Sequence, residues 1–314
     1  MNTQNAVIDA ERDIATAVPA GVGPAARERL RGRLMAGVFV LIWCTGYPAG
    51  KIAVQHGGPF TLLLWRFVLA AAIFGALALL ARAEWPGVRA LGHSVVIGLL
   101  SLALSFAGIY EGLSLGVSTG VCAMFIGAMP LVTALLGLFF GERVGARQWV
   151  GLLLGFAGVV LVLDGRLDGN HASTVGYGAC ALGLLGFSVG TLYQKRYSSE
   201  IDLRIGLSVQ HVAAALAVLP LAYFAEHFRT DGSAAYLSAL AWLVLVNAVG
   251  GFALFFALLR RGAATEVAAL FYLMPPVTAL MGWLVIGEHL SLPMLPGFAL
   301  VAIGVWLGTR RAAA

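Results

Sequence analysis

The chain has 314 residues, of which 60% are hydrophobic and only 11% are charged, and its mean hydropathy is +0.89. A soluble domain carries about 25% charged residues, so this composition excludes a soluble globular protein and indicates an integral membrane protein. The apolar runs are long and continuous, which favours spanning helices of about 20 residues over the alternating strands of a membrane barrel. The three cysteines share no metal-ligand spacing, and we expect neither a metal nor a cofactor.

The N-terminal stretch, residues 1–32, is polar and carries eight charged side chains. No uninterrupted apolar segment follows a basic start, so we do not expect a cleaved signal peptide. We interpret residues 1–32 as a flexible cytoplasmic tail.

Ten apolar segments follow the tail, and they predict an all-α membrane protein with ten transmembrane helices. The first five are Leu34–Val54, Phe60–Leu80, Leu91–Leu113, Ser118–Phe140 and Trp149–Leu163. The second five are Gly176–Tyr197, Leu203–Phe224, Leu237–Leu258, Thr265–Ile286 and Leu295–Thr309.

Basic residues are distributed unequally between the two sets of loops. Sixteen of the twenty flank the segments on the side of the chain termini: Arg12, Arg27, Arg29, Arg31, Arg33, Arg82, Arg89, Arg143, Arg147, Lys195, Arg196, Arg204, Arg260, Arg261, Arg310 and Arg311. Short loops rich in Lys and Arg stay in the cytoplasm. We therefore expect both termini to be cytoplasmic, and we interpret the net charge of +5 as a topological signal and not as a nucleic-acid interface.

The chain repeats itself. The run from Pro130 to Gly137, which continues to Gly141-Glu142, returns as the run from Pro275 to Gly282, which continues to Gly287-Glu288. The offset between matched positions is 144 at Gly46 and Gly190, and also at Arg66 and Gln210, and it reaches 146 at Gly151 and Gly297. Five spans per half is an odd number, so the second half should cross the membrane in the opposite sense to the first. Inverted repeats of this kind are typical of secondary transporters, with a duplicated scaffold or a channel as the alternative.

This arrangement, together with the Trp43-Cys44-Thr45-Gly46 helix that continues to Lys51, resembles the EamA-type drug/metabolite transporter superfamily. The resemblance extends from about Arg33 to Arg311, with repeats at 33–165 and 175–311. The resemblance implies an inner-membrane exporter of amino acids or other metabolites. The superfamily includes an aromatic amino-acid exporter group. The resemblance also implies a cavity lined by the first, third, fourth, sixth, eighth and ninth helices.

Polar and aromatic residues near the middle of those helices are the predicted substrate-binding residues. They are Trp43, Thr45, Tyr47, Ser105, Met124, Phe187, Ser188, Thr191, Asn247, Phe252, Tyr272 and Met274. An aromatic cavity with a few hydrogen-bonding groups suits hydrophobic amino acids. Asn247 is the strongest candidate, because an amide in the middle of an apolar helix needs a partner. For any single aromatic residue, packing is the alternative role.

Interior prolines and membrane-embedded charges complete the candidate site. Pro130 and Pro275 each remove a helical hydrogen bond, and we interpret them as hinges, with simple packing as the alternative. Charges inside a membrane are costly and usually functional. Lys51, Arg66 and Glu111 are therefore predicted at the outer mouth of the cavity, although both cations could also snorkel to the interface.

No Asp or Glu occupies the middle of any segment, and the first helix lacks the glutamate of the superfamily's small multidrug members. We therefore expect facilitated or gradient-driven export by alternating access, with a small molecule and the lipid bilayer as partners, as a monomer or weak dimer. A drug or nucleotide-sugar carrier is the alternative within transport, and a channel or scaffold is the alternative outside it. Gly186-Phe187-Ser188-Val189-Gly190 matches the spacing of a hydrolase nucleophile elbow, but it lies within an apolar helix, and we expect no enzymatic activity.

Overall fold

The computed structural model describes residues 24–137, 145–167, 173–197, 201–260, 274–289 and 295–309. In these ranges the regular secondary structure is helical, apart from one isolated bridge between Gly57 and Thr230. Within these described ranges, six helices are long and apolar enough to cross a membrane: Leu30–His56, Pro59–Leu80, Val88–Ser114, Thr174–Tyr197, Leu203–Phe224 and Ala234–Phe255. Shorter apolar helices accompany them. The predicted all-α membrane class is confirmed, whereas ten crossings exceed what helix length and composition establish.

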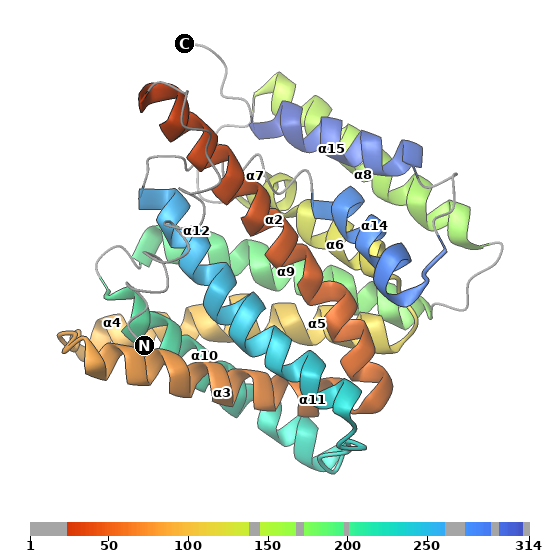
Figure 1. The fold of residues 1–314 in the computed structure, drawn as a ribbon. Helices are drawn as coiled ribbons and strands as arrows, with labels where there is room; N and C mark the ends of the chain where they lie inside the picture. The colour runs from red at the N-terminus through yellow and green to blue at the C-terminus, as the bar shows by residue number, and fades with distance from the viewer. Residues whose placement is uncertain are drawn as a thin grey trace.

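The first half of the chain contains α2 (Pro24–His56), α3 (Pro59–Leu80), α4 (Val88–Ile97), η1 (Gly98–Leu104), α5 (Ser105–Ser114), α6 (Thr119–Gly127), α7 (Met129–Gly137) and α8 (Ala146–Leu167). The second half contains α9 (Thr174–Tyr197), α10 (Leu203–Phe224), α11 (Ala234–Ala241), η3 (Trp242–Gly250), α12 (Gly251–Arg260), α14 (Met274–Ile286) and α15 (Leu295–Thr309), as Figure 1 shows. Helices far apart in sequence cross one another and share one interior.

Two π-helical stretches were not predicted from the sequence. η1 joins α4 to α5, and η3 joins α11 to α12. Their first residues, Gly98 and Trp242, are 144 positions apart, which is the offset of the repeat. A π-helix widens the helical turn and is frequent at functional sites. The widened turn therefore occurs at the same place in both halves.

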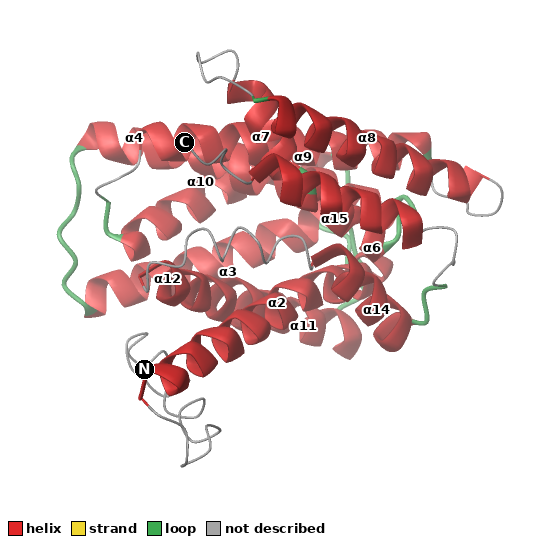
Figure 2. Cartoon of the chain, turned by 90° about the horizontal axis from the view of Figure 1, so that it is seen from above, coloured by secondary structure: helices red, strands yellow, loops and turns green. Residues whose placement is uncertain are grey.

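Glycine contacts show how matched helices pack against each other. A Cβ built on Gly158 of α8 would lie 2.7 Å from the carbonyl oxygen of Gly297 in α15. A Cβ built on Gly304 of α15 would lie 2.6 Å from the carbonyl oxygen of Gly151 in α8. The contacts run in opposite order along the two helices, so α8 and α15 are antiparallel, and they lie side by side in Figures 1 and 2. Small residues allow this close backbone approach.

The same antiparallel arrangement recurs in the pairs that enclose the interior. In α2 and η3, Gly46 contacts Asn247, and Gly251, at the start of α12, lies near Trp43. In η1 and α9, Gly190 contacts the hydroxyl oxygen of Ser101. Gly46 matches Gly190 at an offset of 144, and their partners Asn247 and Ser101 lie in the two π-helical stretches η3 and η1, so the two contacts are equivalent in the two halves.

Two carboxylates close one end of the bundle, which we call the capped end and define by Glu226 and Glu288. Glu226, just beyond α10, accepts hydrogen bonds from the backbone nitrogens of Phe60 and Thr61 at 3.0 and 2.7 Å. Glu288, just beyond α14, accepts bonds from the backbone nitrogen of Thr119 at 3.1 Å and from its hydroxyl at 2.6 Å. Each carboxylate thus caps a helix N-terminus, where free N–H groups and the helix dipole favour negative charge.

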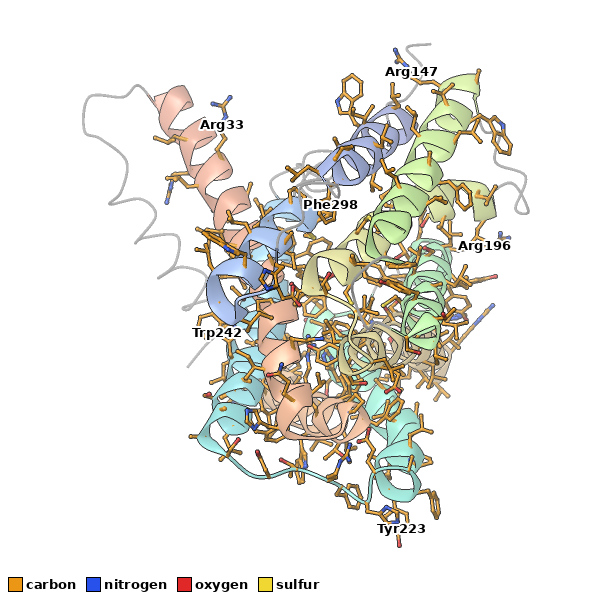
Figure 3. The ribbon with its side chains drawn as sticks, turned by 90° about the vertical axis from the view of Figure 1, so that its right-hand side faces the viewer. Arg33, Arg147, Arg196, Tyr223, Trp242 and Phe298 are labelled. Carbon is orange, nitrogen blue, oxygen red and sulfur yellow. The ribbon has the colours of Figure 1, made fainter. Side chains whose placement is uncertain are left out.

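The turn between α3 and α4, which is flanked by Arg82 and Arg89 and marks the basic end of the bundle, lies at the left of Figure 1, and the segment between α10 and α11, which carries Glu226, lies at the lower right. Figure 3 views the bundle from the right-hand side of Figure 1, with Arg33 in α2 and Arg147 in α8 near the top and Tyr223, near the C-terminus of α10, at the bottom. The turn between α2 and α3 is attached to the segment after α10 at the capped end. His56 Nδ1 and the Asp231 carboxylate are 2.7 Å apart, and the Gly58 amide donates to the Arg229 carbonyl at 2.8 Å.

Candidate functional site

A cavity lies in the interior where helices of both halves meet. Its lining residues come from five elements: Trp43, Gly46 and Tyr47 in α2, Ser105, Phe106, Ile109 and Tyr110 in α5, Ile126 in α6, Phe187 in α9 and Asn247 in η3. The space open to the centre of a water-sized sphere is about 40 Å³. One water needs about 10–15 Å³ by this measure, so the cavity holds a few waters. Its wall is aromatic, with hydroxyl and amide groups between the rings.

Asn247 contributes the amide of this wall and joins three helices. Its Nδ2 donates to the carbonyl oxygens of Ile42 and Trp43 in α2, at 3.3 and 3.2 Å. Its Oδ1 accepts from Arg66 Nη2 in α3 at 2.8 Å. Gly46 makes room for the amide, because a Cβ at this position would lie 2.6 Å from Nδ2. The hydrogen-bond partners that a buried amide requires are therefore supplied by carbonyls of α2 and by Arg66 of α3.

Arg66 lies directly behind the wall of the cavity. Its side chain is 3% exposed, and its Nη1 donates to the Tyr110 hydroxyl at 2.6 Å. Its Cζ lies 4.2 Å from the centre of the Phe106 ring, in a cation–π contact. Its Nε has no hydrogen-bond partner among the described residues. The sequence suggested a position at the outer mouth or an extended, snorkelling side chain, whereas the structure places the guanidinium in the interior.

Five of the twelve predicted substrate-binding residues come together around the cavity: Trp43, Tyr47, Ser105, Phe187 and Asn247. Thr45 is not among the residues that line the cavity. Its hydroxyl donates to the Ile42 carbonyl and accepts from Trp242 Nε1. Ser188 and Thr191 turn their hydroxyls back to carbonyls of their own helix, those of Leu184 and Phe187.

The remaining predicted contacts are core residues or lie outside the described ranges. Met124 and Met274 are fully buried in two separate hydrophobic clusters. Phe252 packs edge-on against Trp43 and belongs to an aromatic group with Phe74 and His211. Tyr272 falls within 261–273, outside the described residues. A long apolar side chain in the middle of a helix serves packing equally well, and the sequence alone does not separate the two roles.

The other predicted charges lie toward the capped end. Lys51 Nζ donates to the carbonyls of Leu113 and Val117 at 2.6 and 3.2 Å. A cation is favourable there, because the C-terminus of α5 leaves carbonyls without helical partners. Glu111 accepts a hydrogen bond from the Ser114 hydroxyl at 3.5 Å. These two residues belong to the end of the helices and do not line the cavity described here.

The predicted hinges differ in their surroundings. The helical run expected over 118–140 is divided at Ala128 into α6 and α7, two residues before Pro130. Pro275 lies in the first turn of α14 as described, and the preceding residues 261–273 lie outside the described ranges. A further proline, Pro48, lies inside α2 next to the cavity residue Tyr47 and was not identified from the sequence.

Five cavity residues, Gly46 among them, were not predicted to bind substrate, and helical spacing could have identified three of them. Phe106, Ile109 and Tyr110 share one face of α5 with Ser105, at the helical spacing of three and four residues. Ile126 faces them from α6. The rings of Phe106 and Tyr110 also lie against the guanidinium of Arg66.

The Gly-Glu that ends the second copy of the repeated motif has a structural explanation. Gly287 adopts a left-handed backbone with φ of +68°, and its amide donates to the Trp283 carbonyl, which ends α14. Glycine is preferred at this position because it has no Cβ. The turn directs Glu288 onto the N-terminus of α6. The first copy, Gly141-Glu142, lies outside the described residues.

These features define a multi-span α-helical membrane protein whose two halves together enclose a polar and aromatic cavity. The model of the EamA-like transporter family matches the chain twice, over residues 30–164 and 174–310. The chain therefore belongs to the EamA-like transporter family, and the predicted membership of the drug/metabolite transporter superfamily is confirmed.

Several relatives match over most of the chain. A probable amino-acid metabolite efflux pump of Escherichia coli (strain K12) is 25% identical over 286 residues, which cover 87% of this chain and 93% of the relative. The uncharacterized inner membrane transporter YedA of the same strain is 25% identical over 264 residues, covering 83% of this chain and 84% of the relative. A WAT1-related chloroplastic protein of Arabidopsis thaliana, At3g02690, is 27% identical over 277 residues, which cover 84% of this chain and 66% of the relative.

A solved structure shares the fold. This crystal structure of a protein superposes with a TM-score of 0.61 at 21% sequence identity, and the match covers 88% of this chain and 96% of the other.

Proposed function

We propose that the chain is an inner-membrane secondary transporter that exports small metabolites, in particular hydrophobic or aromatic amino acids, by alternating access. The observation that carries this proposal is the interior cavity, whose wall combines Trp43, Tyr47 and Phe187 with the polar groups of Ser105 and Asn247. Aromatic surface with a few hydrogen-bonding groups suits an amphipathic cargo of this kind. The efflux pump of Escherichia coli, similar over 87% of the chain, supports this cargo class.

We further propose ten membrane crossings in two inverted repeats, residues 33–165 and 175–311. The antiparallel packing of matched helices and the equivalent contacts of Gly46 and Gly190 support this architecture. The cavity lies where the two halves meet, as expected for alternating access in inverted-repeat carriers. The basic end of the bundle would then face the cytoplasm together with both termini, and the capped end would face outward.

The transport step is proposed to be facilitated or driven by the cargo gradient. Proton-coupled carriers commonly use a carboxylate within the membrane. Among the described residues, no Asp or Glu lines the cavity. A monomer or weak dimer remains our prediction for the functional unit.

Counterflow into proteoliposomes tests the proposal. Vesicles containing the purified protein are loaded with unlabelled L-phenylalanine, and entry of labelled L-phenylalanine, L-leucine, a cationic dye and a nucleotide sugar is followed. We expect saturable entry of the amino acids that depends on the internal load. Entry of the dye or the nucleotide sugar alone would favour the other carrier class, and flux without saturation or dependence on the load would indicate a channel.

A pair of tryptophan variants supplies the control. Trp43→Ala removes an aromatic wall of the cavity and should lower counterflow at least tenfold. Trp283→Ala removes a ring that is 51% exposed on α14, away from the cavity lining, and should leave counterflow unchanged. Equal counterflow by the two variants would contradict the assignment of this cavity as the binding site.

A further inference from the structure

Arg66 carries a buried positive charge whose surroundings are neutral. Its hydrogen-bond partners are the Tyr110 hydroxyl and the Asn247 amide oxygen, and its third neighbour is the Phe106 ring. In the described part of the chain, no carboxylate lies within 4.0 Å of its nitrogens. Buried charges in proteins are normally paired, because removal from water is costly. The counter-charge expected for this guanidinium is therefore missing from the described residues.

The hydrogen-bonding capacity of the guanidinium also remains unused. The group has five N–H donors in a planar fork. Only two hydrogen bonds to described residues engage these donors. Nε is buried and has no hydrogen-bond partner in the part of the chain that the structure describes. Nε and Nη2 form one edge of the group, the edge that binds a carboxylate through two parallel bonds. On this edge Nη2 donates to Asn247, its one hydrogen-bond partner among the described residues, and Asn247 is a wall residue of the cavity.

The fold itself does not require a cation at this position. The residue that matches Arg66 in the second half is Gln210, which is also buried, at 8% exposed. Both halves build the same helix pairings, yet only one has a charge here. A residue needed for packing alone would be expected in both.

We infer that Arg66 binds the carboxylate of the cargo from behind the cavity wall, so that the protein selects molecules with a carboxylate next to an aromatic or aliphatic group. This inference rests on the proposed function and specifies the substrate class of the same site. A shift of the Asn247 side chain exposes the Nε–Nη2 edge to the cavity. The rings of Trp43, Tyr47 and Phe187 then contact the apolar part of the cargo. A purely cationic molecule meets the positive charge of Arg66 and is disfavoured.

Four probes separate the two charges of an amino acid. L-Phenylalanine has both charges, 3-phenylpropionate has only the carboxylate, and phenethylamine and L-phenylalaninamide have only the amino group. Binding is measured as the rise in melting temperature of the purified protein in detergent, and also as inhibition of L-phenylalanine counterflow. We expect L-phenylalanine and 3-phenylpropionate to bind at least tenfold more tightly than the two amines. Equal binding of 3-phenylpropionate and phenethylamine would overturn the inference.

Two substitutions test the role of the guanidinium. Arg66→Gln removes the charge and should abolish the response to 3-phenylpropionate. Asn247→Asp keeps the size of the side chain and places a carboxylate oxygen where Oδ1 now lies, 2.8 Å from Nη2. The internal ion pair occupies the guanidinium, so 3-phenylpropionate should again give no response. The second carboxylate oxygen faces the Ile42 and Trp43 carbonyls, which lose their hydrogen bonds from Nδ2, so a cooperative melting transition without ligand serves to show that the variant is folded. This second variant keeps the test decisive if Arg66→Gln does not fold.

Arg204→Gln is the matched control. Arg204 pairs with Asp202 at 2.8 Å at the start of α10, outside the cavity lining. The same change there should leave the response to 3-phenylpropionate unchanged. Retention of that response in both Arg66→Gln and Asn247→Asp would refute the assignment of Arg66.

The outcomes also separate this inference from the proposed function. If L-phenylalanine is exchanged but the amines inhibit as well as 3-phenylpropionate does, the role of Arg66 is wrong and the transporter proposal stands. If no amino acid is exchanged while 3-phenylpropionate still stabilises the wild type and not Arg66→Gln, the carboxylate site stands and the proposed cargo is wrong.

Discussion

Asn247 packs against the bare backbone of Gly46, and this contact fixes the position of the amide that Arg66 binds. The equivalent contact in the other half joins Gly190 to Ser101, which has a smaller side chain. The same close approach of two helices thus holds an amide bound to a guanidinium in one half and a hydroxyl in the other. The two halves therefore share the packing at this contact but differ in the polar group that it holds.

Gly46→Ala should disturb the site through this contact. The added methyl group would lie 2.6 Å from Asn247 Nδ2, and the displaced amide would lose its bonds to α2 and to Arg66. Overpacking of this kind costs about 1–3 kcal/mol. We expect a lower melting temperature in detergent and at least a tenfold loss of counterflow.

The control for this change lies in the same helix. A Cβ on Gly37 meets nothing within 4 Å, so Gly37→Ala should be neutral or should stabilise α2 by about 0.5–1 kcal/mol. If Gly46→Ala melts and transports like Gly37→Ala, the close contact is not important for the site.

Glu288→Gln should loosen the capped end. The substitution removes the negative charge from the N-terminus of α6, an interaction worth about 0.3–1 kcal/mol, or up to about 2 kcal/mol when partly buried. Cys122, one turn further along α6, is fully buried and reports on opening. In a background where Cys44 and Cys180 are alanine, we expect faster labelling of Cys122 by an impermeant maleimide.

Glu84→Gln provides the matched change in an exposed loop at the other end of the bundle. Labelling of Cys122 should not change in this variant. Equal labelling rates in the Glu288→Gln and wild-type proteins would show that the carboxylate cap does not hold this end closed.

The segment after α10 should make stability depend on acid pH. The backbone amide of Ser233, followed by His56, lowers the pKa of Asp231 to about 2. A carboxylate with a folded-state pKa below the unfolded value of about 3.9 stabilises the protein above that value, and the contribution is lost as the pH falls toward 2. We expect the melting temperature of the wild type to fall more steeply between pH 4 and pH 2 than that of Asp231→Asn. Parallel curves would contradict the role of this carboxylate.

Pro130→Ala tests the proposed hinge between α6 and α7. The break at Ala128 precedes the proline, which lacks the N–H needed to continue the hydrogen-bond ladder. Alanine at this position restores the donor and should favour a continuous helix. We expect several-fold slower counterflow with unchanged binding of L-phenylalanine and unchanged expression. Pro86→Ala, in the loop before α4, is the control, and equal rates in the two variants would exclude the hinge.

Much of the fold could be predicted from the sequence because a membrane simplifies the signal. Long apolar runs specify helices almost directly, since the backbone must satisfy its own hydrogen bonds in lipid. Gly151 and Gly297, which the repeat matches, both lie at the contact between α8 and α15. The duplication was visible because Gly46 and Gly190 occupy equivalent positions.

The site was harder to predict because its chemistry depends on contacts across the chain. Nothing near Arg66 in sequence indicates that its partners lie at Tyr110 and Asn247, 44 and 181 residues away. The widened turn of η3, which contains Asn247, also has no residue signature. The role of Glu226 as a helix cap was equally hidden in the sequence, because it depends on the contact between the end of α10 and the start of α3.

The uncompensated charge of Arg66 has an electrical consequence if its counter-ion travels with the cargo. Without cargo the central site is positive, and with an amino-acid zwitterion its net charge is the same but the dipole of the ligand compensates it locally. A unit charge that shifts its position across the full membrane field gains about 2.3 kcal/mol per 100 mV. An interior-negative potential therefore acts on this charge in the loaded as well as the empty protein, and it favours the conformation in which Arg66 lies nearer the cytoplasm. We expect an imposed potassium diffusion potential to change the rate of L-phenylalanine exchange in the wild type and to have a smaller effect in Arg66→Gln.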